Sequence, residues 1–192
     1  MIQREAVFPF QATVTAIETF AWRPELQVEQ TPAPQRIAPH SYALEASIAI
    51  EDDDLCISRL IVLHDDHPNP AWGGNYRFVS YTHSEADPEM VTDSLLTDVG
   101  WAWLTESLDS ADALYHHASG TVTCQSSRSY GELADEPDRA EIEIRASWTA
   151  TITRPEDVSA HLQAWQTLAC TSSGVPPLPD DIIPISTRIE RA

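Results

Sequence analysis

The residues of this sequence with the clearest metal-binding chemistry are four neighbours, His64, Asp65, Asp66 and His67. Imidazole nitrogens and carboxylate oxygens bind zinc and other divalent ions. Four consecutive residues do not all turn toward one point without a special loop. Further ligands would come only from residues that folding brings close, namely His83, Glu85, His116 and His117. The alternative is a polar loop after a strand, so we expect no bound metal or other cofactor and keep His64, Asp66 and His67 as the metal candidates.

The patterns of common catalytic sites are missing from the sequence. There is no G-x-S-x-G elbow, no G-x-G-x-x-G and no phosphate-binding loop, and the chain contains no lysine. Cys124 alternates with polar residues, which is typical of a small buried hydrophobe in a strand rather than of a nucleophile paired with His116 or His117. These observations weigh against an enzyme.

Charge and composition limit the partners and the compartment. The chain of 192 residues carries a formal charge of −19, which repels phosphate backbones and anionic membrane surfaces. We therefore expect neither nucleic acid nor a membrane as a partner. The first residues do not resemble a secretory signal, no apolar run is long enough to span a bilayer, and the three cysteines are far apart. A cytoplasmic location is the expectation.

Residues 139–152 are the centre of the predicted fold. Apolar and polar residues alternate strictly along this stretch, which predicts a strand with one face in a core and one in water. Similar patterns predict strands at 43–50, 56–64, 75–82 and 119–127, and a short edge strand fits Leu26 and Val28. Because the connections are short, we expect antiparallel pairing throughout.

Apolar residues at helical spacing predict helices at 8–21 and 88–109 and a last helix that ends at Gly174. Thr153-x-x-Glu156 predicts a capping box for that last helix. The expected fold class is α+β, with helices mainly on one face of an antiparallel sheet and the order α-β-β-β-α-β-β-α. Prolines and glycines predict a loop from His64 to Gly74.

We expect residues 1–192 to form one domain with two proline-rich appendages. The first is an arm at 31–39 in polyproline geometry, and the second is an acidic tail at 175–192. Arg36 and His40 make the arm a candidate for binding a partner, although packing on its own domain is the simpler interpretation.

Two further surfaces are candidates for binding. Trp101 and Trp103 point in divergent directions on the predicted middle helix, so both cannot face one core, and one of them is a candidate interface anchor. The polar face of the sheet is the second surface, and the alternative is a solvated face with cross-strand pairs. Its candidate residues are Thr121, Thr123, Glu143, Arg145 and Ser147.

Several short strings resemble an actinobacterial family catalogued as a domain of unknown function, the one numbered three thousand. They are PAPQR–AP at 32–39, VGWAWLTE at 99–106, SGTVT at 119–123, EIRASWT at 143–149 and GVPPLP at 174–179. The resemblance covers most of the chain and implies no activity, cofactor or catalytic residue. In element order alone, the chain is also similar to type III secretion chaperones and YbjN-like proteins, which implies dimers that hold a partner polypeptide.

The function predicted from the sequence is therefore a non-enzymatic protein-interaction or chaperone-like module, self-associating as a homodimer through the middle helix. Two alternatives stay open. One is a small metal-dependent hydrolase that uses His64–His67, and the other is a small-ligand binder on the polar sheet face.

Overall fold

The computed structural model of the protein describes residues 8–50 and 53–175. Most of the predicted tail at 175–192 therefore lies outside the described residues. The elements are α1 (Phe10–Glu18), β1 (Gln27–Thr31), β2 (His40–Ile50), β3 (Asp53–Asn69), β4 (Gly74–Glu85), α2 (Pro88–Val91), α3 (Leu96–Ser110), β5 (Tyr115–Ser127), β6 (Arg139–Ala150) and α4 (Val158–Ser172), with short 3₁₀ turns η1 (Gly131–Leu133) and η2 (Pro155–Asp157).

The strands form one six-stranded sheet in the order β1-β2-β3-β4-β6-β5, and every neighbouring pair is antiparallel. The predicted α+β class is confirmed. The apolar run of β3 places that strand inside the sheet, while β1 and β5 form its two edges. β1 is the predicted short edge strand, and it ends at Thr31, directly before Pro32.

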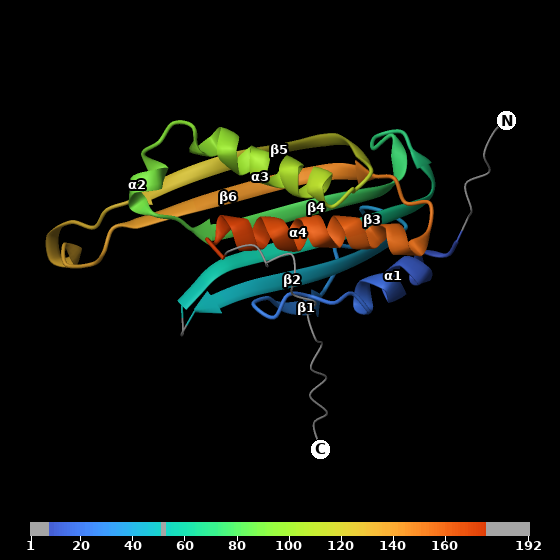
Figure 1. Cartoon of the computed structure of the whole chain (residues 1–192), viewed down its shortest axis with the longest axis horizontal. Helices are drawn as coiled ribbons and strands as arrows, with labels where there is room; N and C mark the ends of the chain where they lie inside the picture. Colours follow the sequence, from blue (N-terminus) through green and yellow to red (C-terminus); the bar gives the residue numbers. More distant parts are fainter. Residues whose placement is uncertain (1–7, 51–52, 176–192) are drawn as a thin grey trace, which may run out of the picture.

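The helices α1, α3 and α4 lie over one face of the sheet, as Figure 1 shows, and no helix of the described residues lies over the other face. The alternate residues of β6 from Ile142 to Ala150 point into the core between these layers. Trp148 and Trp165 both belong to this core and are fully buried, and burial of a large apolar side chain contributes about 1.5–3 kcal/mol. We call the uncovered side the open face.

Several predicted boundaries are wrong. The first helix spans only Phe10–Glu18 instead of 8–21, and the middle helix is broken into α2 and α3 by residues 92–95. Asp93 accounts for part of this break, because its carboxylate accepts the backbone N–H of Leu95 and competes with helical hydrogen bonding. The strand predicted at 139–152 is β6, and it ends at Ala150 rather than at residue 152.

The loop predicted from His64 to Gly74 is wrong in its first half, because β3 continues through this stretch to Asn69. A register irregularity between His64 and Asn69 lets the strand pass Pro68, which lacks an N–H for regular pairing. The metal candidates His64, Asp66 and His67 are therefore strand residues.

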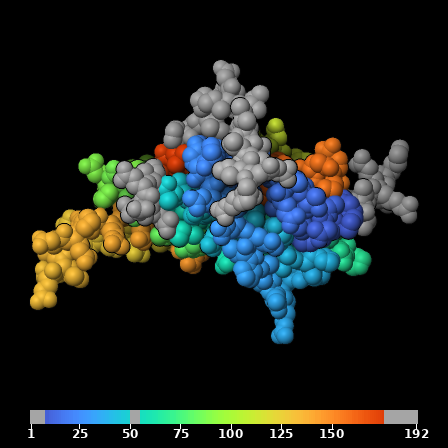
Figure 2. Space-filling view, turned by 90° about the horizontal axis from the view of Figure 1, so that it is seen from below, coloured from blue at the N-terminus to red at the C-terminus, as the bar shows by residue number. Residues whose placement is uncertain are grey.

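The arm predicted at 31–39 is in fact the connection between the paired strands β1 and β2. Thr31 belongs to β1, and Arg36 has a positive φ of 67°, which polyproline geometry does not allow. The connection projects away from α4 (Figure 2). Ile37 within it is exposed, and Ser41 Oγ donates a hydrogen bond to the carbonyl of Pro34.

The capping box predicted from Thr153 and Glu156 is also wrong. The capping carboxylate belongs to Asp157, whose Oδ2 accepts hydrogen bonds from the backbone N–H groups of Thr153 and Arg154 and from Thr153 Oγ1. The chain enters α4 through the turn η2, which shifts the carboxylate that reaches back by one residue.

Candidate metal centre

The candidate site begins with a row of three aromatic side chains across β2, β3 and β4. His40 pairs with His64, and His64 pairs with Tyr76. These residues share a face with Tyr42, Val62 and Phe78, so they lie on the helix-covered side of the sheet, at the end next to α1. The rings of His40 and His64 are 5.5 Å apart, and those of His64 and Tyr76 are 4.5 Å apart.

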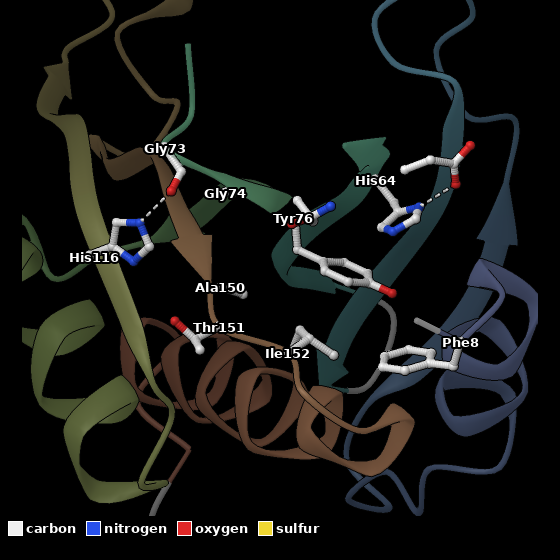
Figure 3. A pocket seen from close by; sticks show the side chains of 11 residues that line it. Phe8, His64, Gly73, Gly74, Tyr76, His116, Ala150, Thr151 and Ile152 are labelled. Carbon is white, nitrogen blue, oxygen red and sulfur yellow. Dashed lines mark hydrogen bonds and ion pairs between the residues drawn. The ribbon is translucent and has the colours of Figure 1, made fainter. Parts of the chain in front are cut away.

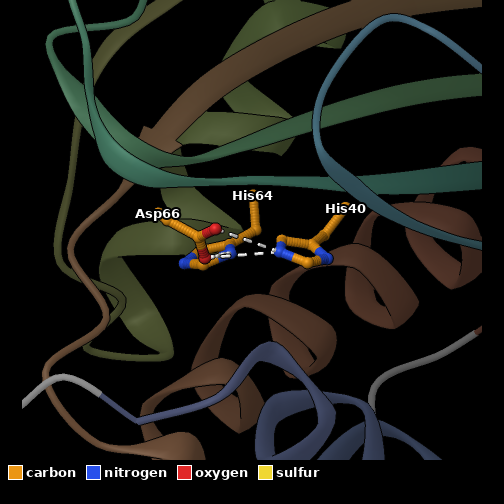
Figure 4. A group of neighbouring side chains, drawn as sticks. All are labelled: His40, His64 and Asp66. Atoms are coloured by element: carbon orange, nitrogen blue, oxygen red, sulfur yellow. Dashed lines mark hydrogen bonds and ion pairs between the residues drawn. The ribbon is translucent and has the colours of Figure 1, made fainter.

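Asp66 completes the group because it follows His64 by two residues on the same strand. Its carboxylate oxygens lie 3.3 and 3.4 Å from Nε2 of His40. Oδ1 also lies 3.9 Å from Nδ1 of His64. One ligand atom from each residue can be chosen so that all lie within 4.8 Å of one another (Figure 4).

Phe10, the first residue of α1, holds the two imidazoles in place. Its ring stacks on His64 at 5.4 Å and on His40 at 5.6 Å, with interplanar angles of 11° and 23°. The helix is anchored by the buried Val14 and Ile17, and the Thr13 hydroxyl lies 2.9 Å from the Tyr76 hydroxyl. The amphipathic first helix thus fixes a wall against the imidazole pair.

Burial differs strongly within the group. The His64 side chain is 8% exposed, whereas those of His40 and Asp66 are 41% and 66% exposed. Burial lowers the pKa of His64, partly opposed by the neighbouring charge of Asp66. The imidazole therefore favours its neutral form, the form that binds metals.

The most informative atom is Nδ1 of His64. It is buried, and no hydrogen-bond partner reaches it within the described chain. Buried polar atoms are nearly always paired, because an unpaired one costs about 1–3 kcal/mol. An unpaired imidazole nitrogen that faces a carboxylate and a second imidazole is one that a cation would satisfy.

The spacing of the three groups fits a zinc-class ion. Zinc binds imidazole nitrogen and carboxylate oxygen at about 2.0–2.2 Å, so tetrahedral ligands lie roughly 3.4 Å apart. The observed separations from Asp66 to the two imidazoles are 3.3 and 3.9 Å, and the three ligand atoms all lie within 4.8 Å of one another, so the side chains would draw together around a bound ion. Two imidazoles and one carboxylate form a three-ligand set, which leaves a coordination position open.

A pocket of about 160 Å³ adjoins the group (Figure 3). His64 and Asp66 line one side of it, and His116 lines the opposite side, where its Nε2 lies 3.2 Å from the carbonyl of Gly73. Thr151 and Ile152, which follow β6, line its floor. An open coordination position at the three-residue group would therefore be reachable by a small molecule.

The structure separates the other site residues predicted from the sequence. His67 is exposed and does not belong to the three-residue group, and His83 lies further along the sheet, 3.4 Å from Glu141. His117 lies against the carbonyl of Trp72, and its φ is 51°. Arg36 is exposed within the β1–β2 connection.

The predicted polar-face residues do come together on the open face. Thr121 pairs with Arg145, Thr123 with Glu143 and Ser119 with Ser147. The hydroxyl of Ser147 already accepts a hydrogen bond from the Arg77 guanidinium within the protein. Thr149 is an exception among the polar residues of the alternating stretch 139–152, which we expect to face water. It is fully buried between Arg77 and the carbonyl of Trp72.

Trp101 and Trp103 diverge around α3, and each is partly buried against its own chain. Trp101 lies on Gly120 of β5, where an added Cβ would come within 2.8 Å of the indole. Trp103 lines a shallow hollow between α3 and α4, beside Gln163 and Thr167. Neither lies near the metal candidates.

Sequence reasoning missed that His40 belongs with His64. Both residues lie on the core-facing positions of a hairpin in which Ile48 pairs with Cys56 and Leu44 with Leu60. Continuing this register along the hairpin, away from the turn between β2 and β3, pairs residue 40 with residue 64. The signal was thus present in the alternation of the two strands, but it was hidden because His40 was assigned to the proline-rich segment before it.

The fold and the site together define an α+β protein with one antiparallel sheet, helices over a single face, and a two-histidine, one-carboxylate group at the end of that sheet. The family model described as "Protein of unknown function (DUF3000)" matches residues 7–182, and the chain belongs to this family. No curated protein and no solved structure matches the chain significantly. The likeness to secretion chaperones stays a prediction.

Within residues 8–50 and 53–175, no helix has both the length and the apolar character of a membrane span.

Proposed function

We propose that this protein binds a divalent ion of the zinc class through Nε2 of His40, Nδ1 of His64 and one carboxylate oxygen of Asp66. The observation that carries the proposal is the buried Nδ1 of His64, which lacks a partner and lies in a group whose ligand atoms are within 4.8 Å of one another. Imidazole and carboxylate ligands favour zinc, cobalt and similar ions over calcium or magnesium, which prefer oxygen.

With three protein ligands, the ion would keep water at its remaining position. A metal-bound water is acidified strongly and becomes a nucleophile near neutral pH, so the site is suited to hydrolysis of a small substrate in the adjoining pocket. This supports the metal-dependent alternative of the sequence-based predictions, with His40 replacing His67 in the ligand set. An ion held there would also contact the neutral, unpaired imidazole that the fold has buried.

Direct metal titration tests the proposal. Tag-free protein, stripped of metal and freed of chelator, should bind one equivalent of Zn²⁺ by calorimetry and one of Co²⁺ by visible absorption. His40→Ala and Asp66→Asn should each weaken metal binding at least about tenfold. Mutating a residue that only hydrogen-bonds a metal ligand already lowers metal affinity by about that factor. Both positions are partly exposed, so the fold should tolerate the changes.

The matched control is His67→Ala, one residue beyond Asp66 and outside the group. It should bind metal like the unaltered protein. Metal binding that survives both His40→Ala and Asp66→Asn, or that disappears in His67→Ala, would contradict the assignment.

The protein-interaction function is a separate proposal, favoured by a different part of the molecule. The edge of the sheet at β5 is unpaired in the described chain.

A cytoplasmic location is also retained as a proposal, supported by three free cysteines, two of them buried.

A further inference from the structure

The edge strand β5 has an unusual exposed side. It is the last strand of the sheet, so one line of its backbone N–H and C=O groups has no partner strand among the described residues. Such an edge is a template for pairing with another strand, and proteins usually protect it with proline, lysine, a bulge or shortness. The opposite edge, β1, is protected in this way, because it has five residues and is followed by Pro32.

The long regular part of β5, residues 119–127, carries none of the usual protection. It reads SGTVTCQSS, without a charged residue or a proline. The bulge of this strand lies before it, between His116 and Ser119. Arg128 lies after it and is held by Asp138 at 2.6 Å. In a chain with a formal charge of −19, this segment is a neutral strip on which two copies would not repel each other locally.

The strip is self-complementary about Thr123. In an antiparallel pair with a second copy centred on that residue, Val122 would face Cys124, Thr121 would face Gln125, and Ser119 would face Ser127. Val122 and Cys124 are the half-buried, core-facing residues of the strand, whereas Thr121 and Gln125 are exposed on the open face. Gly120 would face Ser126. The other pairs would join residues of similar polarity on the same face of the sheet, which suits a two-fold interface between identical chains.

Trp101 supports the same surface from the helix side. It lies on Gly120, within the strip, and remains only partly buried. A strand added beyond β5 would lie beside this indole and cover more of it, and a partly buried aromatic residue at the centre of a contact is a typical interface anchor.

We propose that two copies of this chain associate by antiparallel pairing of β5 with β5, which joins their sheets into one. The predicted homodimer is thereby assigned to a strand edge with Trp101 beside it, in place of the middle helix alone. The partner is a second copy rather than an unrelated strand, because the strip is neutral and matches itself in reverse.

Introducing a charge at the two-fold position tests the pairing. Thr123 is exposed, and in the dimer it would face its own counterpart, so Thr123→Lys and Thr123→Glu each place two like charges opposite each other. By analytical ultracentrifugation, in the presence of a chelator, the unaltered chain should be dimeric at micromolar concentration. Each variant should weaken association at least about tenfold, and an equimolar mixture of the two should restore it as a heterodimer.

The matched control is Gln27→Lys, an exposed position on the other edge strand, which should leave association unchanged. A second measurement covers the case in which a Thr123 variant is unstable. Hydrogen exchange of the unaltered chain should slow between residues 119 and 127 as its concentration rises. A chain that is monomeric at about 100 µM, or a dimer that neither charge variant weakens, would overturn the proposal. Because the chelator removes any metal, these outcomes are independent of metal binding.

Discussion

Trp148 donates its indole N–H to Nδ1 of His161 over 3.1 Å inside the core, where neither side chain is more than 1% exposed. The bond joins the strand β6 to α4. Phe78 of β4 packs against the imidazole, with the two ring centres 4.9 Å apart. His161 must be neutral to accept this hydrogen bond. His161 takes no part in the proposed metal site or dimer contact, and it makes the stability of the core depend on pH.

The pH dependence follows from the direction of the shift. Burial lowers the pKa of His161 from 6.5 to about 4, although the nearby charge of Asp157 opposes the change. Below pH 6.5 the unfolded chain binds a proton that the folded chain refuses, so stability is full above pH 6.5 and falls toward pH 4. The full contribution is about 3 kcal/mol.

Urea unfolding at several pH values measures this contribution. His161→Gln supplies an acceptor that does not titrate, so the difference in slope between the two proteins from pH 6.5 to 4 isolates His161 from the carboxylates. Equal slopes would mean that the imidazole is not held neutral in the core.

The two faces of β6 should respond very differently to substitution. Ile144 is fully buried, so Ile144→Asp places an unpaired carboxylate in the core and should unfold the protein. Its neighbour Arg145 is exposed, contacts both carboxylate oxygens of Glu143 at 3.1 and 3.2 Å, and lies 5.7 Å from the centre of the Tyr81 ring. Arg145→Ala should cost less than about 1 kcal/mol. Similar melting temperatures for the two variants would contradict the assignment of faces.

The cap of α4 offers a test between adjacent acidic residues. Asp157→Ala removes an acceptor used by Thr153 and Arg154 and should cost about 1–2 kcal/mol. Glu156 is exposed and does not make these bonds, so Glu156→Ala should stay within about 0.5 kcal/mol of the unaltered protein. Denaturant midpoints compare them, and a larger loss from Glu156→Ala would restore the capping box predicted from the sequence.

The proposed metal should stabilise the fold without being required for it. The ligands lie at one end of the sheet, apart from the core around Trp148 and Trp165, so the metal-free protein should remain folded. An ion at a free concentration of 100 times its Kd adds about 2.7 kcal/mol. Thermal melts with and without Zn²⁺ should show this increase in the unaltered chain and lose it in Asp66→Asn. An equal increase in both proteins would place the zinc elsewhere.

Features that depend on residues near one another in the sequence could be predicted. Features that depend on contacts between distant segments could not. Alternation along β6, β5 and β2 identified these strands and the side of β6 that faces the core, and with the short connections it predicted the antiparallel sheet, because side-chain direction in a strand depends only on local geometry. The composition likewise indicated an acidic chain without a common catalytic motif. Helix limits and the cap were less accurate, because they depend on single hydrogen bonds such as those of Asp93 and Asp157.

The candidate sites depended on tertiary structure. His40 and His64 are 24 positions apart in the chain and meet only through the register of β2 with β3, and Phe10 reaches them only because α1 packs across the sheet end. The burial of Thr149 follows from the path of the chain at Trp72, and the exposure of β5 follows from its place as the last strand. Local pattern determined which residues face inward. Long-range pairing decided which of them meet, because contacts between distant segments depend on the packing of the whole sheet and its helices.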